Sequence, residues 1–210
     1  MRLLFEVSWV PTVHVFAWDL PRVTLFAMAH APTTWLALLR GINVGSANVV
    51  KMAELRAHLA GHGFEEVRTY IQSGNVIWHD TLADRKTARE RVTGALDELF
   101  GHPIDAVVVP SQFIEMVVAR APARFAEDKQ TLRCDVMYLM PDLNAHDVVA
   151  ALPLREGVDE ATAGPGVIYF SRTIEGNSRS KLSRIVGTPI YQRMTIRNWN
   201  TTRKLSAMLA

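Results

Sequence analysis

The stretch Trp35–Gly41, which reads WLALLRG, decides the fold because it begins an alternation of strands and helices that runs twice along the chain. Its five apolar residues stop at Arg40–Gly41 and predict a buried strand. We expect the first round to have the order β-α-β-β-α-β-α over residues 33–120. The expected strands lie at 35–39, 67–73, 76–78 and 104–109, and the expected helices begin near residues 52, 84 and 111.

Local periodicity supports this order. Met52, Leu55 and Leu59 recur at the spacing of one helix face. Residues 67–73 alternate as a half-buried strand does. Gly74–Asn75 is a two-residue hairpin signal, which predicts that the chain returns at once as the next strand.

A second round follows over residues 121–210 and ends in a C-terminal helix. Two successive βαββαβ units predict a duplicated ferredoxin-like α+β sandwich, in which antiparallel sheets carry helices on one face. The duplication is inferred from the order of elements and not from matching residues. The expected elements are strands at 132–140, 158–163, 167–170 and 194–197, and helices at 144–152, from Ser178 or Ser180 to 186, and after Asn200. Ser111, Asn144 and Asn200 are the expected helix caps.

Residues 1–32 do not fit either round. Charged and proline residues interrupt their apolar runs, so they lack the uninterrupted core of roughly 7–15 residues that a secretory signal needs. The longest clean run, Leu25–Ala29, is too short to span a bilayer. We expect Met28 to be the natural start, with residues 1–27 as an upstream extension or tag. An added helix or strand packed on the domain is the alternative.

Composition and charge narrow the class of protein. The 210 residues are 49% hydrophobic and 21% charged, which is typical of a globular chain and not of a disordered or coiled-coil one. The single cysteine, Cys134, cannot form an internal disulfide and is expected to pack as a small apolar residue, so we expect a cytoplasmic protein with no membrane partner. The sequence predicts no oligomeric state.

The net charge of +2 hides an asymmetry between the two ends of the chain. Residues 171–210 hold eight basic residues against one acidic residue, a balance of +7, and the first 170 residues therefore carry −5. Such a basic segment predicts a phosphate-bearing partner, either a small molecule or a nucleic acid. Charges that only solvate helices are the alternative.

The common catalytic motifs are absent from the sequence. It contains no P-loop, no dinucleotide-binding glycine pattern, no G-x-S-x-G and no H-E-x-x-H, and we expect neither a cofactor nor a metal. Glu54, His58 and His62 share one helix flank, but an exposed polar flank explains them better than a metal site. Catalysis is not expected, although an enzyme with a cleft between the halves stays an alternative. Its candidate titratable residues are His79, Asp80 and Glu175.

Polar residues gather where the predicted strands end, and they form the candidate ligand site. Arginine, asparagine and serine at such positions can bind an anion through several short, directed donors. We expect a small anionic or phosphate-bearing ligand, in a pocket that Arg40 and Arg197 share. An interdomain polar network is the alternative for Arg40, Asn43 and Arg197. The candidate residues are Arg40, Asn43, Ser73, Asn75, Lys181, Arg197 and Asn198.

RNA binding through the basic C-terminal half is a further alternative. Ferredoxin-like sheets include RNA-binding modules that stack bases on sheet aromatics, and Tyr169 or Phe170 could serve as such a platform. The aromatic-rich signature string of those modules is absent from the chain.

Three ordered segments carry a family resemblance. Residues 38–45, 69–76 and 195–201 resemble the signature segments of a bacterial family known as domain of unknown function 1697. The resemblance covers Thr33 to Leu209 and leaves residues 1–32 as an N-terminal extension outside the family. It implies a two-part ferredoxin-like α+β fold. It brings no activity, cofactor or catalytic residue.

Overall fold

The computed structural model describes residues 32–45, 48–82, 84–126 and 131–209. The expectations for residues 1–31, Met28 as the natural start among them, lie outside the described residues. No helix in the described ranges is both long and apolar enough to cross a membrane.

The first half of the molecule follows the predicted order. Its four strands form one antiparallel sheet in the order β2-β3-β1-β4. Its elements are β1 (Thr33–Leu39), α1 (Met52–Gly61), β2 (Glu65–Tyr70), β3 (Asn75–Asp80), α2 (Arg85–Phe100), β4 (Ala106–Pro110) and α3 (Ser111–Ala119).

The second half forms a second antiparallel sheet in the equivalent order, β6-β7-β5-β8. Its strands are β5 (Leu132–Leu139), β6 (Asp159–Gly164), β7 (Val167–Thr173) and β8 (Met194–Asn198). Its α-helices are α4 (Ala145–Ala151), α5 (Pro189–Gln192) and α6 (Trp199–Leu209), and its 3-10 turns are η1 (Ala123–Ala126), η2 (Asn177–Arg179) and η3 (Leu182–Ile185).

The strand registers show that the two halves are repeats. Leu36 of β1 pairs with Ile77 and Val109, as Val136 of β5 pairs with Tyr169 and Arg197. The chain also leaves both central strands in the same way. The amide of Leu39 donates to Gly74, and the amide of Leu139 donates to Gly166. The predicted fold class, a duplicated ferredoxin-like α+β sandwich, is confirmed.

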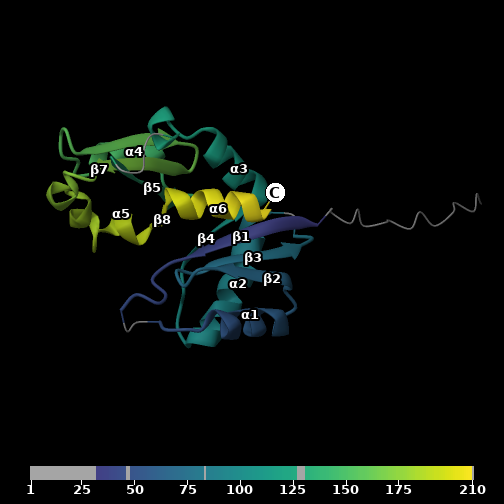
Figure 1. The fold of residues 1–210 in the computed structure, drawn as a ribbon. Helices are drawn as coiled ribbons and strands as arrows, with labels where there is room; N and C mark the ends of the chain where they lie inside the picture. The colour runs from purple at the N-terminus through teal and green to yellow at the C-terminus, as the bar shows by residue number, and fades with distance from the viewer. Residues whose placement is uncertain (1–31, 46–47, 83, 127–130, 210) are drawn as a thin grey trace, which may run out of the picture.

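Apolar residues pack the helices and sheets into layers, and Figure 1 shows α1 and α2 below the first sheet and α6 between the two sheets. Helices α1 and α2 pack on one face of the first sheet. Residues of α4, η3 and α5 pack on one face of the second sheet. Helices α3 and α6 lie side by side between the two sheets, where residues of both halves form one continuous core. Both faces of each sheet are therefore covered.

Local signals explain where several helices begin and end. The carboxylate of Asp84 accepts a hydrogen bond from the amide of Thr87 at 2.9 Å and caps α2, which ends at Gly101 in the left-handed conformation. Asn144 caps α4 as expected, through the amides of His146 and Asp147.

Two expected caps are wrong. Ser111 is the first residue of α3, follows Pro110 at the cap position and makes no capping hydrogen bond. In α6 the side chain of Asn198 accepts from the amide of Thr201 at 2.8 Å, so the cap lies two residues before the expected cap Asn200 and the helix begins at Trp199. In both helices the preceding strand runs directly into the first turn, and this shifts the start.

The single helix expected up to residue 186 is also wrong, because η2 and η3 divide this segment. The buried carboxylate of Asp159 accepts from the amide of Lys181 at 3.0 Å and also binds the amide of Arg155. This hydrogen bond fixes the backbone at Lys181, between η2 and η3, from outside the segment. Tertiary contact therefore overrides the local helical pattern.

Candidate functional site

A cavity of ≈ 460 Å³ lies where the end of β1 meets the segment from α5 to β8. We call it the Arg40 cavity. Among the described residues, two arginines and no carboxylate line it. The lining residues are Leu39, Arg40, Gly41, Ile42, Val44 and Ser73 from the first half, and Tyr191, Met194, Thr195, Ile196 and Arg197 from the second.

Arg40 presents a free guanidinium to this cavity. Its backbone amide donates to Asp105 at 2.9 Å, which fixes the residue at the end of β1. The half-buried side chain lies over the ring of Tyr191, with the guanidinium carbon 5.2 Å from the ring centre. Its guanidinium makes no hydrogen bond or ion pair to any residue that the structure describes. Its N–H groups are therefore available to a ligand.

Arg197 is buried, with 7% of its surface exposed, and ties the two halves together. Its five N–H groups all point at neutral oxygen atoms, most of them on the first half. Nε donates to Asn75 Oδ1 at 2.6 Å, Nη1 to Thr195 Oγ1 at 2.7 Å and to the carbonyl of Ile196 at 2.9 Å, and Nη2 to the carbonyls of Leu39, Ser73 and Gly74 at 2.8, 2.9 and 3.3 Å. Arg197 therefore has no donor left for a ligand.

The charge of Arg197 has no acidic partner among the described residues. Burial lowers the pKa of Arg197 to about 10, so the side chain is still a cation at neutral pH. In the first sheet the equivalent residue is Val109, and the residue equivalent to Asn75 is Val167 in the second. Both valines are fully buried. The hydrogen bond between buried Arg197 and buried Asn75 therefore has no counterpart at the equivalent positions, which two valines occupy. It lies at the end of the molecule that holds the Arg40 cavity.

Asn43 and Asn75 shape the cavity walls without lining them. Asn75 is completely buried and donates to the carbonyl of Tyr70 at 2.8 Å and to Ser73 Oγ at 3.2 Å. Asn43 has a positive φ and donates to the carbonyls of Val50 and Gln72 at 3.1 and 2.9 Å. Both amides hold the loops around Arg40 and Ser73 in place.

The hairpin tip differs from the expected two-residue turn. Strand β2 ends at Tyr70 and β3 begins at Asn75, so residues 71–74 make the connection. Gly74 has a φ of +72°, and a Cβ at this position would collide with Ile42 and Leu39. Only glycine allows the tip to lie this close to the loop after β1.

Of the seven candidate residues, the Arg40 cavity brings together Arg40, Ser73 and Arg197. Lys181 and Asn198 lie elsewhere. Lys181 precedes η3 on the second half, and Asn198 lines a separate cavity of ≈ 440 Å³. That second cavity also contains Arg133, Asp135 and Arg172, besides apolar residues.

Sequence reasoning did not identify Thr195 and Tyr191 as lining residues. Thr195 had a usable signal, because alternation along β8 places it on the same face as Arg197. Tyr191 lies on the short helix α5, and its position opposite Arg40 depends on how the halves dock. No local pattern encodes that contact.

The catalytic candidates do not form a site with the Arg40 cavity. His79 contacts Thr34 Oγ1 at 3.2 Å and Glu66 at 3.3 Å. Asp80 forms an ion pair with Arg91, and Glu175 follows β7 in the other half. None of the three lines the cavity.

The histidines on α1 also have internal contacts. His58 Nε2 lies 2.7 Å from the carbonyl of Ala95, and His62 lies 3.5 Å from Glu98. Among the residues that the structure describes, no three histidine, cysteine or acidic side chains form a group that could hold a metal ion.

The expectation that Tyr169 or Phe170 forms a base-stacking platform is wrong. Tyr169 is 3% exposed and donates its hydroxyl to the carbonyl of Val117 at 2.8 Å, and Phe170 is fully buried. Because helices cover both faces of the second sheet, neither ring can reach a base.

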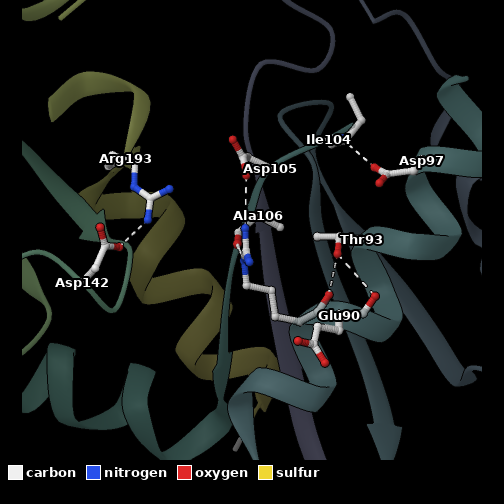
Figure 2. Close-up of polar contacts among 9 residues, drawn as sticks. Glu90, Thr93, Asp97, Ile104, Asp105, Ala106, Asp142 and Arg193 are labelled. Carbon is white, nitrogen blue, oxygen red and sulfur yellow. Dashed lines mark hydrogen bonds and ion pairs between the residues drawn. The ribbon is translucent and has the colours of Figure 1, made fainter. Parts of the chain in front are cut away.

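Part of the basic C-terminal segment is also engaged internally. Besides buried Arg197, Arg172 lies 3.6 Å from Asp135. Arg193 donates to Asp142 at 2.5 Å, a pair that Figure 2 shows facing Asp105 of the first half. The hydrogen bond to Asp142 raises the pKa of Arg193, and the charges of Asp142 and, least, of Asp105 add to this rise. Of the eight basic residues in the segment 171–210, several therefore have internal partners, and fewer than eight can attract a phosphate-bearing partner.

Fold and cavity together define a duplicated ferredoxin-like protein with an arginine-lined cavity between its halves. The chain belongs to the family described as Protein of unknown function (DUF1697), whose model matches residues 33–169. This confirms the resemblance seen in the sequence. The chain is also similar to the solved structure of the conserved bacterial protein SP0830 from Streptococcus pneumoniae. The two share 28% identity and a TM-score of 0.73, over 85% of this chain and 99% of that one. No curated protein matches the sequence.

Proposed function

We propose that this protein binds a small anionic or phosphate-bearing ligand in the Arg40 cavity. The observation that carries the proposal is the free guanidinium of Arg40 in a cavity that no carboxylate of the described part of the chain lines. A planar guanidinium binds carboxylate and phosphate oxygens in a bidentate manner. Ser73 adds a second donor, because its hydroxyl accepts from Asn75 and keeps its own hydrogen for a ligand.

Arg197 supports the same function without touching the ligand. Its buried cation lies in the wall of the cavity and has no acidic partner among the described residues. In a protein interior a charge acts over several ångströms with little screening. An anion beside Arg40 would therefore be attracted by the charges of both arginines, whereas a cation would be repelled by both.

A thermal-shift screen with phosphate, pyrophosphate, sugar phosphates and nucleotides tests the proposal. A ligand present at 100 times its dissociation constant should stabilise the folded state by about 2.7 kcal/mol. Arg40→Gln should abolish the shift, because it removes the charge that, among the described lining residues, still has donors for a ligand.

Arg68→Gln is the matched control. Arg68 is an exposed arginine on the edge strand β2 and does not line the cavity, so this variant changes the net charge equally. It should retain the full shift. The proposal is wrong if no anion stabilises the protein, or if both variants lose the shift to the same extent.

A further inference from the structure

The Arg40 cavity has an apolar part that a simple anion would leave unused. Besides its polar groups, it is lined by Ile42, Val44 and Met194. Its volume of ≈ 460 Å³ falls within the range of about 300–1,000 Å³ in which protein pockets take ligands with a carbon skeleton. An inorganic oxyanion fills only a small part of such a volume. The lining therefore matches a ligand with both an anionic group and an apolar body.

Val44 marks the place where contact with that apolar body would add most to the binding free energy. The side chain is 66% exposed although it lines the cavity. Covering apolar surface is favourable by about 25 cal/mol per Å². A ligand that reaches Val44 gains this contribution, whereas a bare phosphate does not.

The position of Arg40 over Tyr191 favours a flat body over a bulky one. The guanidinium carbon lies over the Tyr191 ring, 5.2 Å from its centre, and the N–H groups lie in the guanidinium plane. On the side away from Tyr191, the guanidinium can stack on a second ring while its edge holds an oxyanion. The same side chain can in this way recognise both parts of one ligand.

We propose that the Arg40 cavity binds an organic anion that carries a flat aromatic ring, of which a nucleoside monophosphate is an example. The proposal rests on the proposed function and narrows its ligand class. The anionic group contacts Arg40 and Ser73, and the ring lies among the guanidinium face, Val44 and Met194.

The test is isothermal titration calorimetry of the full chain, at one ionic strength, with four probes. These are adenosine 5′-monophosphate, adenosine, ribose 5-phosphate and inorganic phosphate. The monophosphate should bind about tenfold or more tightly than ribose 5-phosphate, because only the former covers apolar surface. Adenosine alone should bind weakly, because it lacks the anion.

Two exposed valines of one loop provide a matched pair of variants. Val44 lines the cavity, whereas Val49 is 69% exposed and does not. Val44→Ser should weaken binding of the monophosphate roughly threefold or more and leave ribose 5-phosphate unchanged. Val49→Ser should change neither. Both side chains are on the surface, so both variants should fold.

The outcomes separate the two proposals. Equal affinity for the monophosphate, ribose 5-phosphate and phosphate would overturn the proposal of an aromatic ring and leave the proposed anion site intact. Equal effects of Val44→Ser and Val49→Ser would overturn it as well. If none of the phosphates binds, the proposed function itself fails.

Discussion

Arg197 is a cation in a position where the first repeat has the apolar side chain of Val109. Burying a charge is unfavourable unless hydrogen bonds compensate for the lost water. Here the compensation comes from neutral oxygens, chiefly of Asn75, Leu39 and Ser73. Those oxygens are in turn buried or half-buried, so each partner depends on the other.

We therefore expect Arg197→Gln to lower the free energy of unfolding by about 2–4 kcal/mol, because each buried carbonyl that loses its donor costs about 1–3 kcal/mol. The shorter neutral side chain leaves the carbonyl of Ser73 without this donor, and the carbonyl of Leu39 keeps only the 3.5 Å contact from the hydroxyl of Thr195. Urea denaturation followed by circular dichroism measures the change, with Arg68→Gln as a control that should stay within about 0.5 kcal/mol of the wild type. A loss below 1 kcal/mol for Arg197→Gln would show that the network contributes little.

Asp135 gives a prediction on pH. Burial raises the pKa of this carboxyl above 3.8, although nearby Arg172 and Arg133 oppose the shift. The folded state thus binds a proton more tightly than the unfolded state, and stability falls as pH rises from 3.8 through the raised pKa. Asp135→Asn should remove this loss of stability, because the asparagine does not titrate. The stability of the variant relative to the wild type should therefore increase as the pH rises from 3.8 through the raised pKa of Asp135. Urea titrations between pH 3 and 7 measure it; a relative stability that decreases with pH would show that the arginines dominate.

At the scale of elements, periodicity predicted every strand and most helices, because burial of one face dictates the pattern. In α1, Leu55 and Leu59 are fully buried with Met52 partly buried beside them, and the run of β1 from Trp35 to Leu39 is buried throughout. The segment at 177–192 could not be predicted, because Asp159 binds its backbone from another strand. The site was likewise predictable only in part. The position of Arg40 at a strand end follows from the sequence, but the burial of Arg197 depends on how the two halves dock.

Helix α6 offers an element-scale test of capping. Asn198→Ala should lower the free energy of unfolding by about 1 kcal/mol, because the amide of Thr201 loses its acceptor. Asn200→Ala is the paired variant, since Asn200 is exposed and makes no capping hydrogen bond. It should change stability by less than about 0.5 kcal/mol. A larger loss for Asn200→Ala than for Asn198→Ala would mean that the helix begins where the sequence alone suggests, and equal losses would mean that Asn198 does not cap α6.

At the scale of the whole molecule, the two repeats share one core between their sheets. Leu36 and Ile77 of the first half lie in the same cluster as Val136 and Leu205 of the second. Neither repeat can bury this face alone, so they should unfold as one unit.

Native-state hydrogen exchange checks this cooperativity. Amides in β1 and β5, the central strands of the two sheets, should open with the same free energy. The free energies should stay equal as urea is added. A lower value confined to one sheet would mean that the repeats are independent domains.

The cavity between the halves is the feature on which the functional account depends. A crystal structure of the protein with adenosine 5′-monophosphate tests it most directly. We predict the phosphate within hydrogen-bond distance of the Arg40 guanidinium and the base beside Val44. A nucleotide bound instead in the second cavity, at Arg133 and Arg172, would contradict the account.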